Sequence, residues 1–504
     1  MRIAIIGGGI SGIAAARVLL NFGHEVVVLE RGPRLGGVWA VTYPEVRLQN
    51  IAEHYRLGDF PWPFPPDLHP TREQILRYLE EAVAHFHIDV RVSQKVVAMN
   101  EAPEGWDVEI EGPAGPARER FDFVVVASGQ YTGSPRSPEL ADRARFKGEV
   151  LTDRQVLDLD VLTGKQVAVV GFGKTAVDMA TFAAQRGAEV HHVFREPRWL
   201  IPRHILGVHM ANLLFSRIST VMIPAWVHPS EGERFLHDKM LPVVNGFWSM
   251  IAGLVRLQTG LHGVHRDPAV RRRFALLLPD APVPFQMRSA LALAPDDYFP
   301  MVAKGRIEPH RGEPVGFKEE ALILSDGREI PCNLVILSTG FTSPRFPFLP
   351  ESYRTMLERE EDGVQLYRHL LHPRIPRLAF AGQNHGFLHV PGIELSMLWL
   401  AAHLRGDLRL PPVEEMEQQI DEIRRWKAEN ILFEPSRGGA VSTRFQQYFD
   451  VLLGDLGLPH KRKSNPLSEL VAPYGPSDYA GILDEYTRSR EGATGPRDPL
   501  PFST

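Results

Sequence analysis

Apolar positions along the chain first gather into a strand, a helix and a second strand. Residues 3–6 form an apolar run that ends in glycine, and residues 10–20 have the spacing of a helix. Residues 26–29 form another apolar run, which ends at Glu30. Uninterrupted apolar runs of this length are typical of parallel strands that are covered on both faces. The pattern therefore predicts a strand–helix–strand unit at the start of the chain.

A second unit of the same kind lies further along the chain. The apolar runs 166–170 and 190–194 flank a glycine-rich turn and a helical segment. The sequence shows no other internal repeat. Two such units predict an α/β protein with two dinucleotide-binding, Rossmann-like domains.

The pattern between and after these units is more varied. Residues 57–70 are rich in proline and aromatic side chains and predict a loop, and residues 71–86 predict an amphipathic helix capped by Thr71. Residues 319–341 predict two strands joined by an Asp-Gly turn and then a buried strand. A helix-rich stretch covers about 413–432.

Two segments differ from the rest in composition. Residues 203–285 are apolar, rich in Trp, Phe and Met, and become basic towards their end. We expect them to form core and to line a substrate pocket, and contact with a membrane surface is the less favoured alternative because the apolar runs are short. Residues 461–504 are polar with scattered proline and glycine, and predict an extended or partly disordered C-terminal arm.

The first glycine-rich turn has the spacing G-x-G-x-x-G. Gly7 allows a tight turn, Gly9 lets a pyrophosphate approach the backbone, and Gly12 lets the helix pack on the strand. Ser11 lies in the same turn, at the helix N-terminus that stabilises phosphates. Glu30 stands where an acid accepts hydrogen bonds from a ribose hydroxyl. These residues predict a dinucleotide site.

The second glycine-rich turn differs from the first at two places. Alanine stands at the third glycine position, which the pattern tolerates, and the second strand ends in Arg195 rather than in an acid. Arginine there can pair with the 2′-phosphate of NADP, and a solvated surface charge is the alternative. The turn predicts a second site that prefers NADPH to NADH, with the candidate ligands Gly171, Gly173, Lys174, Thr175, Arg195 and Arg198.

Composition and charge narrow the class of protein. The net charge of −5 argues against a nucleic-acid partner. The single cysteine, Cys332, excludes a redox cysteine pair, is expected to be an inert buried thiol, and favours an intracellular, cytoplasmic location. No stretch has the length of a membrane span, and the N-terminus has no signal-peptide pattern. The histidines form no metal-binding motif, so we expect no metal.

Several motifs occur in an order that is typical of one family. They are GGGISGIAAA from residue 7, ERGPRLGGVW from residue 30, GFGKTAVDMA from residue 171 and LSTGF from residue 337. With these motifs the sequence resembles the flavin-containing monooxygenases over most of residues 1–405. This family belongs to the class B flavoprotein monooxygenases, with the Baeyer–Villiger and N-hydroxylating enzymes. The resemblance implies FAD in the first site and NADPH in the second.

The resemblance also implies roles for residues outside the two turns. Asn50 matches an asparagine near the oxygen-reactive face of the flavin, with a simple turn asparagine as the alternative. Asp297, in the similar segment 294–308, is the second catalytic candidate. His385 and His389 flank the loop after Gly382, where a structural role is favoured. The other residues implied to lie at the cofactors are Arg31, Gly37, Val38, Trp39, Val96, Gly129, Gly340 and Gly382.

The family further implies a domain arrangement and a reaction. The FAD domain would be discontinuous, 1–150 and 330–460, and the NADP domain, 151–329, would be inserted and carry the apolar segment. NADPH would reduce FAD, O2 would form a C4a-hydroperoxide, and one oxygen atom would pass to nitrogen or sulfur of a small-molecule substrate. Ketone oxygenation, an NADPH oxidase or reductase, and a non-catalytic flavin-binding regulatory protein are the alternatives. A homodimer is compatible with the sequence.

One fingerprint of the family is altered. The family has F-x-G-x-x-x-H before the second nucleotide domain, with an aromatic residue four positions later. Phe146 and Gly148 are kept here, but Thr152 replaces the histidine and Val156 replaces the aromatic residue. That histidine is credited with coupling the two domains. Thr152 and Asp153 are the candidates to form hydrogen bonds across the linker in its place.

Overall fold

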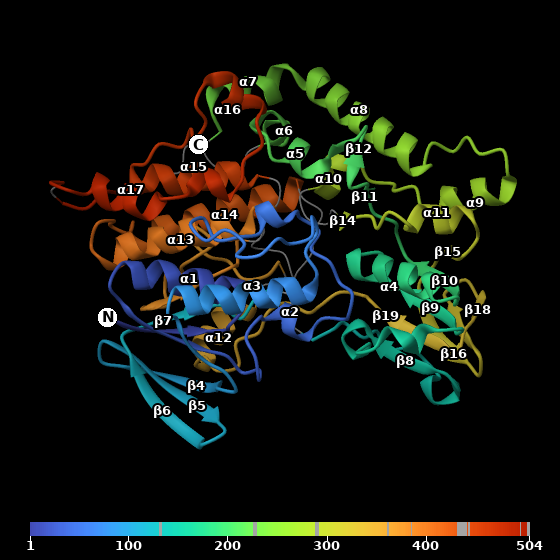
Figure 1. The fold of residues 1–504 in the computed structure, drawn as a ribbon, viewed down its shortest axis with the longest axis horizontal. Helices are drawn as coiled ribbons and strands as arrows, with labels where there is room; N and C mark the ends of the chain where they lie inside the picture. The colour runs from blue at the N-terminus through green and yellow to red at the C-terminus, as the bar shows by residue number, and fades with distance from the viewer. Residues whose placement is uncertain are drawn as a thin grey trace.

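The structure is a computed structural model in which two α/β domains lie side by side, with further helices above both (Figure 1). It describes residues 1–130, 134–224, 229–287, 292–359, 362–384, 386–430, 441, 444–493 and 495–500. His385, which the sequence places beside the loop after Gly382, lies outside the described residues. The mixed α/β class with two Rossmann-type domains is confirmed.

The first domain is built on a five-stranded parallel sheet. β1 and β2 are each buried over four consecutive residues, as expected for strands covered on both faces. β1 pairs with β2 on one side and with β7 on the other. The strands, in their order across the sheet, are β20 (Leu378–Phe380), β7 (Phe123–Val126), β1 (Arg2–Ile6), β2 (Glu25–Leu29) and β3 (Asp89–Arg91).

Helices cover one face of this sheet, and a three-stranded antiparallel sheet covers the other. α13 is buried from Val390 to Ala402 and packs on α1 and α15, so it forms the centre of the helical layer. Thr71 caps α3 by accepting the N–H of Gln74, as the sequence predicts. The helices of this domain are α1 (Ile10–Asn21), α2 (Val38–Val41), α3 (Arg72–His85), α12 (Glu351–Glu358), α13 (His389–Leu404), α14 (Val413–Asn430) and α15 (Phe445–Leu456).

The second domain repeats the plan of the first. Its parallel sheet again has the first strand of the unit in the middle, and α4 (Lys174–Gln185) corresponds to α1. The order is β15 (Ile307–Arg311), β10 (Glu189–Phe194), β9 (Gln166–Val170), β19 (Leu334–Leu337) and β8 (Glu149–Thr152). The antiparallel sheets are β4 (Lys95–Ala102), β5 (Gly105–Gly112) and β6 (Gly115–Phe121) in the first domain, and β16 (Pro314–Lys318), β17 (Ala321–Leu324) and β18 (Glu329–Pro331) in the second. The repeat is therefore a whole domain.

The first predicted domain boundary, at 150/151, lies within two residues of the start of β8, whereas the second, at 329/330, precedes β19 of the second sheet. β8 begins at residue 149 and forms the edge of the second sheet, and β19 pairs there with β8 and β9. The chain therefore returns to the first domain after Leu337, not at residue 330. The prediction was wrong because a buried apolar strand carries no local mark of the sheet that it joins.

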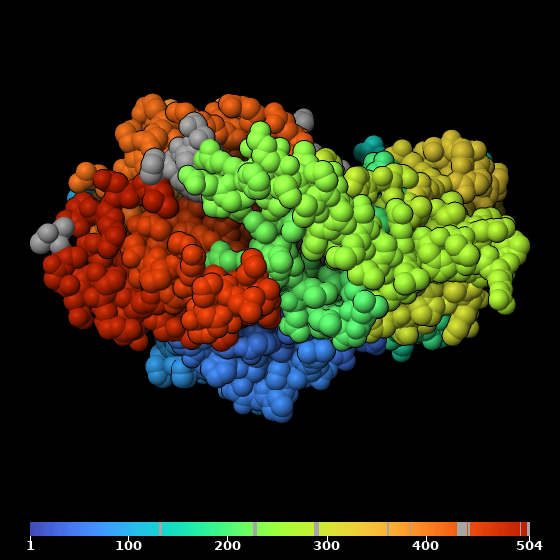
Figure 2. Space-filling model, turned by 90° about the horizontal axis from the view of Figure 1, so that it is seen from above, coloured from blue at the N-terminus to red at the C-terminus, as the bar shows by residue number. Residues whose placement is uncertain are grey.

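Residues 203–285 form a helical layer above the two domains, which Figure 2 shows in green tones running across the upper face. Around Trp248 and Val255 they build a small core of their own, while Ala211 and Phe215 pack into the core of the first domain. The elements of this layer and its flanks are β11 (Leu200–Ile201), β12 (His204–Ile205), β13 (Val208–His209), α5 (Met210–Leu214), α6 (Arg217–Val221), α7 (Glu231–Lys239), α8 (Leu241–Thr259), α9 (Pro268–Leu276), α10 (Val283–Met287), β14 (Ala292–Leu293) and α11 (Tyr298–Ala303).

The outer face of α8 is apolar and open. Leu241, Met250 and Leu257 are exposed, so the segment is only partly the core that the sequence predicts. Among the described helices none is by itself long and apolar enough to cross a membrane, and α7 with α8 meets this test only as a pair bent by 81°.

The C-terminal residues do not form the extended arm that the sequence predicts. α16 (Pro466–Val471) and α17 (Ile482–Ser489) are ordered helices, and Tyr479, Leu483 and Tyr486 are buried in the core of the first domain. Their spacing is helical, but it spans only about two turns among proline and glycine, which is too short to stand out in the sequence.

We expect Leu483→Ala to destabilise the protein by about 2–5 kcal/mol, the usual cost of truncating a buried leucine. Leu483 is 3% exposed, whereas Leu467 in α16 is 69% exposed. Leu467→Ala should therefore change the stability by less than about 0.5 kcal/mol. Denaturant unfolding of both variants measures the difference, and two equally small effects would contradict the docking of α17.

Candidate functional site

The first glycine turn, at the carboxyl end of β1, is fixed by main chain packed on main chain. A Cβ atom at Gly12 would lie 1.9 Å from the carbonyl oxygen of Gly7, and one at Gly7 would lie 2.4 Å from that of Ala127. Neither glycine can be replaced without moving α1 or β7 away from β1. The packing leaves the N-terminus of α1 open towards the carboxyl edge of the sheet.

Glu30 and Gly9 are placed to meet a ligand at this turn. The buried carboxylate of Glu30 accepts the N–H groups of Gly8 and Gly32 at 2.7 Å each, and it keeps lone pairs for a ribose hydroxyl. A Cβ atom at Gly9 would meet its nearest neighbour, the Cα of Gly37, at an ordinary 3.4 Å. The protein alone does not require glycine at position 9, so a phosphate at the helix N-terminus accounts for it.

The segment after Glu30 folds back onto the glycine turn, as the resemblance implies. The N–H of Gly36 donates to the carbonyl of Gly8 at 2.8 Å, and a Cβ atom at Gly37 would lie 3.0 Å from the Cα of Gly9. The predicted residues Gly37 and Val38 therefore stand beside the turn that a dinucleotide would occupy.

Three further residues that the resemblance implies at FAD are Trp39, Arg31 and Val96. Trp39 donates its indole N–H to the hydroxyl of Tyr55 at 2.9 Å, and Arg31 is exposed one residue after Glu30. Val96 lies near the start of β4, where the N–H of Gln94 donates to the Glu30 carbonyl at 2.8 Å. The structure thus brings the predicted FAD ligands Arg31, Trp39 and Val96 to one edge of the first sheet.

Three buried amides at the ends of β7 and β20 have polar atoms that no protein group satisfies. Gln130 donates its Nε2 to the carbonyl of Gln383 at 2.8 Å. Among the described residues, the Oε1 of Gln130, the Nε2 of Gln383 and the Oδ1 of Asn384 are buried without a hydrogen-bond partner. Unsatisfied donors and acceptors of this kind fit the edge of a flavin ring, which offers both N–H and C=O groups.

Sequence reasoning missed these three amides. Gln130 and Gln383 directly follow Gly129 and Gly382, which the sequence does place near the cofactor, and Asn384 is the next residue. A polar residue immediately after a glycine at the carboxyl end of a buried strand is the signal that points to them.

Ser11 and Gly382 touch at the start of α1. A Cβ atom at Gly382 would lie 2.3 Å from the Oγ of Ser11, which is itself 3.5 Å from the Nε2 of His389. Burial lowers the pKa of His389 to about 4, so the ring is neutral at neutral pH. This agrees with the structural role that the sequence favours for His389.

Asn50 joins the proline-rich loop region to the loop after Gly382. Its side-chain Nδ2 donates to the main-chain carbonyl of Phe387 at 2.5 Å. The main-chain carbonyl oxygen of Asn50 lies 3.1 Å from the Nδ1 of His69. The side chain is half-buried. Asn50 therefore lies on the cofactor side of the first domain, where an amide could face a reacting atom.

The second glycine turn is held in a similar way. A Cβ atom at Gly171 would lie 2.2 Å from the carbonyl oxygen of Ser338, at the end of β19, whereas one at Gly173 would meet nothing within 4 Å. Gly173 is therefore free for a phosphate to approach. The buried Nε2 of His192 lies 2.7 Å from the Gly171 carbonyl, and burial lowers the pKa of His192 to about 4. A neutral histidine thus supports the turn.

Arg195, the cation that the sequence predicts at this site, lies at the end of the strand beside the second glycine turn. Arg195 directly follows β10, its side chain is 75% exposed, and it lies 3.9 Å from Glu313. Arg198 is half-buried three residues later. Lys174 forms an ion pair with Asp178, and Thr175 is half-buried in the first turn of α4. Arg195 is thus available to an anion beside the second turn.

A hydrogen bond between a tyrosine hydroxyl and a carboxylate joins the two domains. Tyr43, from the segment after α2, is buried in the core of the second domain and donates to Asp178 of α4 at 2.7 Å. Burial raises the pKa of Tyr43 well above its usual value. Thr152 instead directs its N–H and hydroxyl to Gln155 of its own turn, and Asp153 is buried with a raised pKa. The link that the sequence assigns to Thr152 is therefore supplied by Tyr43.

The two crossings between the domains also lie together. Gly129 follows β7 and Gly340 follows β19. The N–H of Arg136 donates to the carbonyl of Gly340 at 2.8 Å, and Pro135 forms a bridge with Phe341. The segments that follow β7 and β19 are thus paired through residues 134–136 and 340–342.

Asp297 lies away from the second glycine turn. Its exposed carboxylate accepts the Nε2 of Gln185, the last residue of α4, at 2.9 Å. The glycine turn lies at the other end of this helix, about 16 Å away at 1.5 Å per residue. The catalytic role of Asp297 stays a prediction.

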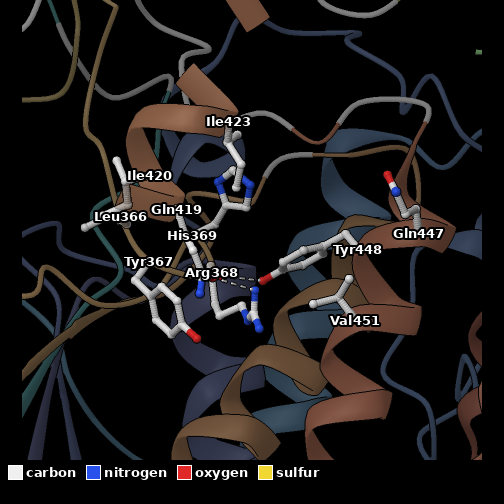
Figure 3. Close-up of a pocket in the computed structure, with 10 residues that line it drawn as sticks. All are labelled: Leu366, Tyr367, Arg368, His369, Gln419, Ile420, Ile423, Gln447, Tyr448 and Val451. Carbon is white, nitrogen blue, oxygen red and sulfur yellow. Dashed lines mark hydrogen bonds between the residues drawn. The ribbon is translucent and has the colours of Figure 1, made fainter. Parts of the chain in front are cut away.

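Two hollows differ in what they can hold. Figure 3 shows the first, a cavity of about 30 Å³ between α14, α15 and residues 366–369, which is large enough only for about one water. There Tyr448 donates to the carbonyl of Arg368 at 2.9 Å, and Arg368 pairs with the buried Asp455. The second hollow, about 680 Å³, is open and is lined by residues 51–53 and 61–68, next to Asn50.

Metal-dependent chemistry and chemistry at a reactive thiol have less support. Within the described residues no three His, Cys, Asp or Glu side chains are grouped to hold a metal. Cys332 is buried, and burial raises its thiol pKa to about 12, so it is the inert thiol that the sequence predicts.

Family models match both halves of the chain. A model described as pyridine nucleotide-disulphide oxidoreductase matches residues 4–222, and one described as flavin-binding monooxygenase-like matches residues 292–460. Residues 223–291, most of the helical layer, lie between the two matches. The chain has a single cysteine, so it lacks the cysteine pair that gives the first description its disulphide.

Individual proteins agree with these models. A probable flavin-containing monooxygenase 1 of Arabidopsis thaliana is 28% identical over 95% of this chain and 96% of its own length. A rat (Rattus norvegicus) dimethylaniline monooxygenase [N-oxide-forming] 2 is 25% identical over 90% of this chain and 82% of its own. Among solved structures, cyclohexanone monooxygenase from Rhodococcus sp. Phi1 bound to NADP+ has a TM-score of 0.66, 19% identity and coverage of 90% and 97%. S-allyl-L-cysteine S-oxygenase from Allium sativum has a TM-score of 0.62, 19% identity and coverage of 97% and 93%.

The fold and the two glycine turns define a flavoprotein with paired dinucleotide domains. With the matches above, the chain is similar to flavin-containing monooxygenases over most of its length. The cofactors of the family are FAD and NADPH, and the first and second sites fit them respectively.

We expect Gly173→Ala to weaken nicotinamide dinucleotide binding, with at least a tenfold rise in KM, while FAD content and folding stay unchanged. The added methyl group has open space in the protein but would meet the pyrophosphate. Gly253→Ala, an equally open glycine in α8, is the control and should leave KM unchanged. Steady-state kinetics and flavin absorbance measure both, and an unchanged KM in Gly173→Ala would contradict the assignment of the turn.

Proposed function

We propose that the chain is an NADPH-dependent monooxygenase that inserts one oxygen atom of O2 into a small organic substrate at nitrogen or sulfur. One observation supports the preference for NADPH over NADH. Arg195 is an exposed cation at the end of β10, where the 2′-phosphate of NADP binds in this type of fold. When bound, FAD takes up electrons from the nicotinamide and activates oxygen.

The residues of this chain orient the reactants and exclude water. Asn50 is held by the carbonyl of Phe387, so its amide has a fixed direction on the cofactor side. Phe215 of the helical layer packs on Phe387 at a ring distance of 5.9 Å and on His54 at 4.5 Å. These rings form an apolar cover over the loop that follows Gly382, as a site that excludes water requires.

Two observations support a nitrogen or sulfur acceptor. The N-oxide-forming and S-oxygenase relatives act on such atoms by their names. The open hollow beside Asn50 is walled by Trp62, Phe64 and prolines, which suits an apolar amine or thioether. Ketone oxygenation is the second candidate, supported by the fold match to cyclohexanone monooxygenase.

The test is reduction of the purified protein by NADPH without oxygen, followed by mixing with oxygenated buffer and single amines, thioethers or ketones. Bleaching of the flavin followed by an oxygenated product supports the proposal, and the product identifies the acceptor atom. Peroxide without product for any substrate indicates an NADPH oxidase. Absence of bleaching by NADPH would overturn the enzymatic assignment.

We expect Arg195→Ala to raise the KM for NADPH by about tenfold or more and to leave the KM for NADH within about twofold, because only NADPH carries the 2′-phosphate. Arg266→Ala, an exposed arginine elsewhere in the chain, is the control. Initial rates with both coenzymes measure the effect. Equal rises for the two coenzymes would remove Arg195 from the phosphate site.

We expect Asn50→Ala to leave the rate of flavin reduction by NADPH unchanged and to raise the share of NADPH electrons that ends as hydrogen peroxide. Asn50 contacts the loop after Gly382 and not the second glycine turn, so it should affect only the oxygen half of the reaction. Asn50→Asp keeps the size but loses the N–H to Phe387 and should act in the same direction. An unchanged peroxide share in both variants would make Asn50 a simple turn residue.

A further inference from the structure

Two buried histidines join the loop that carries Asn50 to the helical layer. His69 precedes α3 in the first domain, and His209 caps the N-terminus of α5. Their Nε2 atoms lie 3.2 Å apart, and the rings are tilted at a centroid distance of 5.2 Å. Both side chains are buried. Neither histidine belongs to a glycine turn, so cofactor binding does not explain this contact.

Backbone groups fix which nitrogen of each ring carries the proton. The Nδ1 of His69 lies 3.1 Å from the carbonyl oxygens of Leu48 and Asn50, which only accept, so this nitrogen is the donor. The Nδ1 of His209 accepts the N–H of Ala211 at 3.1 Å, so it carries no proton. A neutral imidazole has one N–H and one bare nitrogen. His209 therefore donates from its Nε2 to the bare Nε2 of His69.

This arrangement requires both rings to be neutral. A proton on the Nε2 of His69 would place two N–H groups against each other. Burial lowers the pKa of both histidines, that of His209 to about 4, so the pair stays neutral near neutral pH. The titratable and charged groups that face the pair are His54, His204, Arg203 and Asp296.

The loop that carries Asn50 makes a second hydrogen bond to the helical layer and its flanking strands. The side-chain Oε1 of Gln49 accepts the N–H of Leu293 in β14 at 2.9 Å. β14 pairs with β11, which leads directly into β12 and β13. Residues 48–50 are thus held by the Gln49 side chain and by His69, and the Nδ2 of Asn50 donates to the carbonyl of Phe387.

We propose that His69 and His209 are positioning residues for oxygen transfer: their hydrogen bond makes the placement of Asn50 depend on the seating of residues 203–216 against the first domain. This inference rests on the proposed monooxygenase function for its kinetic consequence. Since Ala211 and Phe215 of the same segment pack into the first core, a displaced segment would release the histidine bond and the Asn50 loop together.

Asparagine variants of the two histidines distinguish the hydrogen bond between the Nε2 atoms from the hydrogen bonds that each Nδ1 makes with the main chain. Asparagine can reproduce the contact made by Nδ1 but cannot reach as far as Nε2. His69→Asn keeps a donor to the two carbonyls, and His209→Asn keeps an acceptor for Ala211, while each loses the bond between the histidines. His204→Asn, an exposed neighbour of His209, is the control.

Each single variant should raise the peroxide share about fivefold, as expected for the loss of one buried hydrogen bond, and leave the KM for NADPH and the flavin reduction rate unchanged. The double variant should be no worse than either single variant, because both remove the same bond. Additive effects of the two substitutions, or an equal effect of His204→Asn, would overturn the proposal.

A direct measurement on the unaltered protein keeps the inference separate from the enzymatic assignment. With ¹⁵N-labelled histidine, NMR should show one ring protonated at Nδ1 and one at Nε2, with a scalar coupling between two Nε2 nitrogens. The coupling should persist near neutral pH, since burial lowers the pKa of both histidines. Its absence would overturn the proposal even if NADPH turnover is normal, whereas its presence in a protein that NADPH does not reduce would refute only the proposed function.

Discussion

At Gly12 the main chain of α1 packs directly on that of Gly7, and at Gly7 and Gly171 the turns pack on the main chain that follows β7 and β19; no side-chain atom fits at these contacts. Each helix starts immediately after the turn at the carboxyl end of its strand. The N–H groups of the first helical turn then point at the place where a pyrophosphate can lie. The positions of Glu30 and Arg195, and the choice of coenzyme at each site, follow from this geometry because both residues end the adjacent strand.

Two sites built in this way serve one reaction only if the domains keep a defined relation. Tyr43 provides part of it, since its hydroxyl is buried in the second domain against a carboxylate that also pairs with Lys174. Loss of such a bond leaves a buried carboxylate short of a donor, which costs about 1–3 kcal/mol. The paired crossings at Pro135 and Phe341 add main-chain bridges beside it. A chain without the family's coupling histidine therefore still has a specific link between its domains.

The parts of the fold that depend on short-range spacing could be predicted from the sequence. They include both glycine turns, Glu30, the Thr71 cap and the exposed Arg195. The parts that depend on contacts between distant residues could not, because Tyr43 and Asp178 are 135 positions apart and His69 and His209 are 140 apart. The same limit explains the misplaced boundary at β19.

Charge is distributed unevenly along the expected path of the cofactors. The charged groups Glu30 and Arg195 stand at the turns, where ribose and phosphate are bound. On the side where we propose oxygen transfer, the structure gathers amides, aromatic rings and histidines that burial keeps neutral, such as His389 and His209. Such groups can hold and orient a reactant without adding a charge that would have to be neutralised in a dry site. Selectivity on that side must then come from geometry, and the contact between His69 and His209 is the point at which residues 203–216 can set that geometry.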